Sequence, residues 1–158
     1  MHGEHYFSPM LRISVLLFSS MALMAAEPGI RAELEGGTAP DFSAKATIRL
    51  DMSDSEILIL HNGKAELRLP YQKVNTLEYG QSVSRRYAAA VLISPVLLLS
   101  KSHKHFVTLG FTDRDGQQQS VVIRVEKGDI RTVLTGLEAR TGRRVEYQDN
   151  EARKAGKG

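Results

Sequence analysis

Alternating apolar and polar residues over positions 46–80 constrain the fold of this chain more than any other feature. In Ala46–Met52 the apolar residues fall on one face and the polar residues on the other, which is the period of a half-buried β-strand. Glu56–His61 repeats the pattern, and Asn62–Gly63 follows it. Asn-Gly between two such runs is typical of a hairpin turn, because both residues tolerate positive φ. We therefore expect an antiparallel hairpin that turns at Asn62–Gly63.

Further strands are expected on both sides of a long apolar segment. Lys64–Tyr71 alternates cleanly, and Pro70 should end the pairing or mark a sheet edge, since proline cannot donate to a ladder. Gln72–Gly80 forms a fourth strand in this interpretation. Two more strands are predicted at His105–Phe111 and Ser120–Glu126, joined by a polar turn.

One amphipathic helix is expected after these strands. Its apolar residues recur at i, i+3, i+4 and i+7, namely Ile130, Val133, Leu134 and Leu137. Asp129 can cap the start of this helix and Gly142 can end it. A run of antiparallel strands followed by one helix predicts an α+β fold that is mainly antiparallel β.

This order resembles the PH-like superfold, including GRAM-type and bacterial PH-like domains. The phrases "LRLPYQKVNTLEYG", "HFVTLGFTD" and "VLTGLEARTGRRVEY" carry the resemblance, which covers roughly residues 45–147. The chain also resembles small exported bacterial proteins of unknown function. The resemblance implies two packed antiparallel sheets, or a partly open barrel, capped by one C-terminal helix.

The same resemblance implies a binding function. PH domains bind phospholipid headgroups through basic residues that lie largely around the first hairpin. The turn after Ala46–Met52 reads "MSDSE" and is acidic, so the chain departs from that pattern there. PH-like folds also bind peptides or act as scaffolds, because a fold does not fix a function.

The N-terminus is typical of a secretory signal peptide. Ile13–Ala26 carries no charge, Arg12 precedes it, and small residues end it. Residues 1–26 are therefore expected to be cleaved from an exported, periplasmic or secreted protein, with Met10 as a candidate true start. A buried N-terminal helix or an uncleaved anchor is the alternative.

The remaining boundaries follow from composition. The expected organisation is a linker at 27–44, a PH-like domain at 45–147 with an apolar insert at 85–100, and a polar flexible tail at 148–158.

The apolar insert is the most unusual part of the chain. Ala88–Leu99 contains a single polar side chain, and no acidic residue occurs between Tyr79 and Thr112. As a helix it would reach about 18 Å, which is too short to span a bilayer. Four basic residues flank it as candidate contacts to an anionic membrane or a partner: Arg85, Arg86, Lys101 and Lys104. Alternatively, the run folds over the open end of the sheet as core.

Catalytic motifs are not recognisable in the sequence. The chain has no cysteine, which excludes disulfides and thiol chemistry. His103 and His105 would share one face of a strand and could bind a metal together. No third ligand is near in the sequence, and His61 could supply one only if the hairpin ends meet. The more ordinary interpretation is two histidines in a basic strand lead-in.

We therefore expect an exported, non-enzymatic binding module that needs no cofactor. It would contact an envelope membrane or a protein partner through the basic-flanked segment 85–105, and no nucleic acid partner is expected. A protein-assembly or scaffold role without lipid contact is the alternative, and a metal-dependent enzyme is a weaker one.

Overall fold

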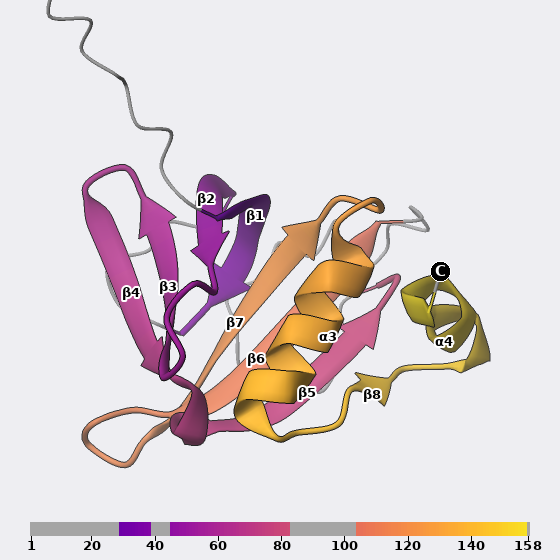
Figure 1. The fold of residues 1–158 in the computed structure, drawn as a ribbon. Coiled ribbons are helices and arrows are strands. Elements are labelled where there is room, and N and C mark those ends of the chain that lie inside the picture. The colour runs from indigo at the N-terminus through magenta and orange to yellow at the C-terminus, as the bar shows by residue number, and fades with distance from the viewer. Residues whose placement is uncertain (1–28, 39–44, 83–103, 158) are drawn as a thin grey trace, which may run out of the picture.

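The computed structural model describes residues 29–38, 45–82 and 104–157. Its strands form one eight-stranded sheet. The described elements are β1 (Ile30–Gly37), β2 (Ala46–Asp51), β3 (Ile57–Asn62), β4 (Ala65–Pro70), the 3-10 helix η1 (Tyr71–Lys73), β5 (Val74–Gly80), β6 (His105–Thr112), β7 (Gln118–Val125), α3 (Ile130–Thr141), β8 (Glu146–Tyr147) and α4 (Asn150–Lys157). The strand order is β4-β3-β2-β1-β7-β6-β5-β8, and the β5–β8 pair is parallel. The sheet curls into a half-barrel with α3 across its concave face (Figure 1). This confirms the expectation of a mainly-β α+β fold.

The core lies between the concave face of the sheet and α3. Val133 and Leu137 of α3 are fully buried among inward-facing strand residues such as Leu77. Burying one such side chain stabilises the fold by about 1.5–3 kcal/mol relative to exposing it. Gly142 ends α3 as predicted, with φ 67° and its N–H donating to the Glu138 carbonyl at 3.0 Å. Asp129 precedes the helix, but its side chain makes no capping hydrogen bond.

The predicted linker at 27–44 is wrong over residues 30–37, which form strand β1. This strand pairs with both β2 and β7 and therefore joins the two halves of the sheet. Ala32 and Leu34 are buried, so β1 has the same alternation as its neighbours. The sequence interpretation missed β1 because Gly and acidic residues surround its short alternating pattern, and this composition is typical of a linker.

The predicted hairpin is present, but its turn is shifted by one residue. Asn62 pairs with Ala65, so the two-residue loop is Gly63–Lys64. Gly63 has φ 58°, whereas Asn62 has no positive φ. Pro70 ends β4, and β4 is an edge of the described sheet, as predicted.

The predicted flexible tail at 148–158 is wrong over 150–157, where the chain forms helix α4 beside α3 and β5 (Figure 1). Ala152 and Gly156 are its buried residues. Their side chains are too small to form an apolar stripe in the sequence, yet small size lets the helix approach the tyrosines beneath it. A methyl group on Gly156 would lie 2.8 Å from Tyr147 Cε1.

Two predicted segments lie outside the described residues: the signal peptide at 1–26 and the apolar insert at 85–100. Among the described residues, none of the helices combines the length and apolar character needed to cross a membrane.

Candidate functional site

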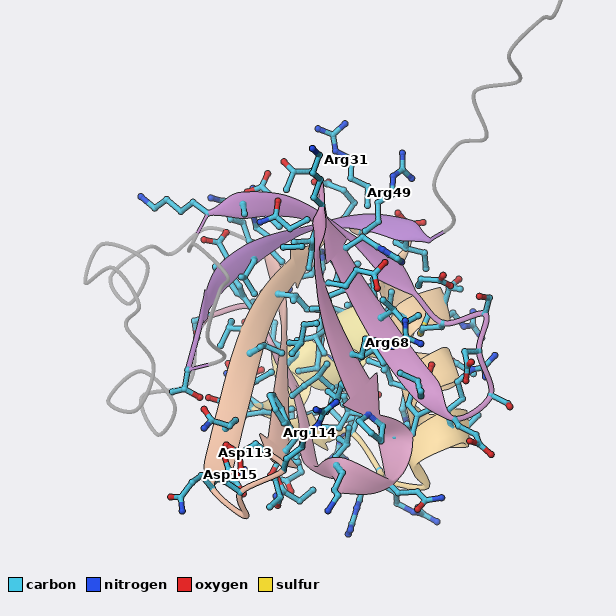
Figure 2. The ribbon with its side chains drawn as sticks, turned by 90° about the vertical axis from the view of Figure 1, so that its left-hand side faces the viewer. Arg31, Arg49, Arg68, Asp113, Arg114 and Asp115 are labelled. Carbon is cyan, nitrogen blue, oxygen red and sulfur yellow. The ribbon has the colours of Figure 1, made fainter. Side chains whose placement is uncertain are left out.

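Two arginines face each other where β1 begins and β2 ends. Arg31 and Arg49 are Cα partners across this antiparallel pair. Directly opposed residues have Cβ atoms about 4.5–5.5 Å apart, and like charges in that position are destabilising. Figure 2 shows Arg31 and Arg49 side by side, pointing away from the sheet, while Arg114 lies at the opposite end.

Lys104 belongs to the same end and the same face of the sheet. His105 and Ala32 are both Cα partners of Val125, on either side of β7. Lys104 immediately precedes His105, and Arg31 immediately precedes Ala32. Lys104 and Arg31 therefore lie one residue further along the same strand register. Because His105 and Ala32 point into the core, their predecessors project on the outer face. Lys104 and Arg31 are thus separated by two strand spacings, or about 10 Å. By the same register Glu126 of the chain after β7 lies between them. We call the three cations Arg31, Arg49 and Lys104 the basic row.

The acidic side chains next to the basic row are engaged by Arg124. Its Nε donates to Glu35 Oε1 at 2.8 Å, it pairs with Glu33, and its Nη1 lies 3.9 Å from Glu126 Oε1. Burial alone would lower the pKa of Arg124, but the hydrogen bonds and charges of Glu33 and Glu35 raise it. This network therefore offsets part of the negative charge beside the basic row.

A buried tyrosine–histidine pair supports the same end of the sheet from inside. Tyr79 is fully buried, and its hydroxyl lies 2.5 Å from His105 Nδ1. Burial, and secondly the charge of Tyr147, raise the pKa of Tyr79 to about 12. Burial, and secondly the charge of Lys127, lower the pKa of His105. Tyr79 therefore stays protonated and shares a hydrogen bond with a neutral His105, whose tautomer decides which group donates. His105 is thus part of the buried fold and not of a surface site.

The three histidines considered as metal ligands do not form one site in the described part of the chain. His105 faces the core, whereas His61 lies on the outer face of β3, and His103 is outside the described residues. His61 Nδ1 is 3.2 Å from Glu66 Oε1, and its Nε2 is 3.7 Å from Asp51 Oδ2. The described residues include no group of three or more His, Asp or Glu that could hold a metal. The alternative in which His61 supplies a third ligand beside His105 does not fit the described structure, because the two side chains point to opposite faces.

A shallow hollow of about 410 Å³ lies beside the C-terminal end of α3. Its polar side chains are used to hold the chain after the helix. Glu138 Oε1 accepts the Val145 N–H at 2.8 Å, and Arg143 Nε donates to the Val74 carbonyl at 3.3 Å. These contacts give the hollow a structural role.

The four predicted contact residues have different outcomes. Lys104 is half-buried and lies in the basic row, whereas Arg85, Arg86 and Lys101 are outside the described residues. Sequence reasoning missed Arg31 and Arg49. The signal for Arg31 was the alternation of Ile30, Ala32 and Leu34, which would have placed it on the outer face of a strand.

The sequence matches no protein-family model, and no curated protein matches it.

Proposed function

We propose that this chain is an exported, non-enzymatic binding module that contacts an anionic envelope membrane. The proposed contact surface is the basic row together with the basic-flanked segment 85–105, which connects β5 to β6 in the sequence. The proposal depends on one observation above all: Arg31 and Arg49 are directly opposed on the outer face of the first hairpin.

Phosphate groups suit this arrangement for a physical reason. Arg49 Nη1 donates to the Gly29 carbonyl at 3.5 Å, and a phosphate that contacts both guanidinium groups would reduce the repulsion between them. Arginine presents several N–H donors in a fixed plane, which matches phosphate oxygens. Lys104 adds a third cation on the same face, and its long stem can lie along apolar material while its ammonium reaches headgroups.

The position of the apolar segment supports a membrane partner. Strand β5 ends at Gly80 and β6 begins at His105, so the chain leaves and re-enters the sheet at the end that carries the basic row. Apolar residues with basic neighbours are typical of segments that bind the membrane interface. The chain segment between β5 and β6 is therefore joined to the sheet at the end that carries the basic row.

We further propose that the fold is PH-like. The strand order β4-β3-β2-β1-β7-β6-β5, with α3 across the open side, supports this assignment. The acidic turn "MSDSE" follows β2, so it belongs to the second hairpin of the sheet. The first hairpin is β1–β2, and it carries Arg31 and Arg49.

Co-sedimentation of the protein with lipid vesicles tests the proposal. We expect binding to vesicles that contain anionic lipid, a decrease as salt is added, and little binding to zwitterionic vesicles. Neutralising Arg85, Arg86, Lys101 and Lys104 together should weaken binding. No binding to anionic vesicles at low salt would exclude membrane contact and leave the protein-assembly role. Equal binding to both vesicle types would contradict recognition of anionic headgroups by the basic residues.

A further inference from the structure

Strand β4 presents an unpaired backbone edge in the described sheet. It pairs with β3 on one side, and it is the terminal strand of the order on the other (Figure 1). Among the described residues, no strand therefore receives the backbone groups of Ala65–Pro70 that point away from β3.

The hairpin register shows which backbone groups point outward. Asn62 and Ala65 close a two-residue loop, and such a closing pair is hydrogen-bonded. Past the end of β4, the Tyr71 N–H donates to the Glu56 carbonyl at 2.9 Å. Every second residue from Ala65 to Tyr71 therefore directs its backbone groups toward β3. Ala65, Leu67 and Leu69 therefore direct their backbone groups to β3. The N–H and C=O groups of Glu66 and Arg68 point to the free edge.

The exposed side chains of β4 are self-complementary. Glu66 and Arg68 project from the outer face, with side chains 43% and 53% exposed, and within one chain Arg68 Nη1 lies 3.4 Å from Glu66 Oε2. If two β4 strands run antiparallel about a twofold axis at Leu67, each Glu66 faces the partner's Arg68. Those are also the residues with outward backbone groups, so each facing pair can exchange two backbone hydrogen bonds.

We propose that β4 pairs with the β4 strand of a second copy of this chain, antiparallel and centred on Leu67, to form one continuous sheet across a symmetric dimer. Neighbouring registers are disfavoured. A centre at Glu66 places carboxylates opposite each other, and a centre at Arg68 places guanidiniums opposite each other and a Pro70 in a pairing position without an N–H. Pro70 therefore limits the paired stretch and helps select the register.

The inner face of β4 fits the same arrangement. Leu67 is only half-buried in the described chain and packs against the core. At the twofold centre it faces the partner's Leu67 in a non-hydrogen-bonded pair, where Cα atoms approach to about 4.5 Å. This contact adds apolar burial to the charge pairs. The proposal does not rest on the membrane contact, because β4 contains no residue of the basic row.

Sedimentation velocity of the full chain over a range of concentrations tests the dimer through charge reversal. Arg68→Glu places Glu66 opposite a carboxylate in both symmetric pairs, and we expect the dissociation constant to rise about tenfold or more. Glu66→Arg should act likewise, and the double variant Glu66→Arg/Arg68→Glu should restore association. The control is Arg114→Glu, an equal charge change at an exposed turn, which should leave association unchanged. A monomer at every concentration, or a double variant no better than the single ones, would overturn the proposal.

Cross-linking checks the register directly, because the chain has no cysteine of its own. Leu67→Cys places two thiols opposite each other at a separation that allows a disulfide. Under mild oxidation it should form a covalent dimer. Ala65→Cys, which would face the partner's Leu69, should not. Equal cross-linking of both variants, or none at position 67, would contradict the register.

Discussion

Removing the Tyr79 hydroxyl measures how much the buried tyrosine–histidine pair stabilises the fold. Tyr79 and His105 are 0% and 6% exposed, and the Tyr79 hydroxyl lies 2.5 Å from His105 Nδ1. In Tyr79→Phe the ring remains, but His105 Nδ1 loses its hydrogen-bond partner inside the protein. Leaving a buried donor or acceptor unsatisfied costs about 1–3 kcal/mol. At about 2 kcal/mol the midpoint of thermal unfolding should fall by roughly 6 °C.

Tyr71→Phe is the matched control for this substitution. Tyr71 is also buried, at 1% exposure, but its hydroxyl has no hydrogen-bond partner in the described structure. Removing an unpaired buried hydroxyl should leave the free energy of unfolding unchanged or increase it. Urea unfolding followed by circular dichroism measures both variants. If Tyr79→Phe lost no more stability than Tyr71→Phe, the Tyr79–His105 bond would not contribute as argued.

Three further substitutions or conditions probe other parts of the fold. Acidification below about pH 6.5 should destabilise the protein. Burial and Lys127 lower the pKa of folded His105 below its ordinary 6.5, so the unfolded chain binds more protons than the folded one. Urea unfolding at several pH values should show a free energy of unfolding that falls with pH, and His105→Gln should reduce this dependence. Arg124→Met should lower the free energy of unfolding by about 3 kcal/mol, because Glu35 is 4% exposed and would lose its cation. The control is Glu126→Gln, at a carboxylate that is 76% exposed. If both variants lost the same stability, the buried Arg124–Glu35 pair would not have the role described. Gly156→Val should lower the free energy of unfolding by about 1–3 kcal/mol through overpacking against Tyr147. Lys154→Val, on the exposed side of α4, should lower it less. Equal losses of stability would argue against close packing of this helix.

The strands that follow strict alternation could be predicted from the sequence. Strand β2 is an example, since Ile48 and Leu50 bury on one side while Thr47 is exposed on the other. Helix α3 was predictable for a similar reason, because its buried residues recur at helical spacing. In both cases the local pattern and the buried face agree.

Elements fixed by long-range contacts could not be predicted in this way. Gly29, just before β1, packs so closely on β2 that an added Cβ would lie 2.8 Å from the Leu50 carbonyl oxygen, a constraint that only the paired strand reveals. Helix α4 is held through Ala152 and Gly156, which give no apolar stripe in the sequence. The basic row depends on β1 as well, because Arg31 meets Arg49 only through the β1–β2 register.

The affinity of the protein for anionic vesicles, with and without the basic row, tests the central claim most directly. Each basic residue near an anionic surface contributes about 1 kcal/mol, so the triple variant Arg31→Gln/Arg49→Gln/Lys104→Gln should bind roughly 100-fold more weakly at low salt. The matched control neutralises three exposed basic residues away from this end, Lys73, Arg114 and Arg144, and should retain most of the affinity. If the triple variant and the control bound anionic vesicles equally well, the basic row would not be the contact surface.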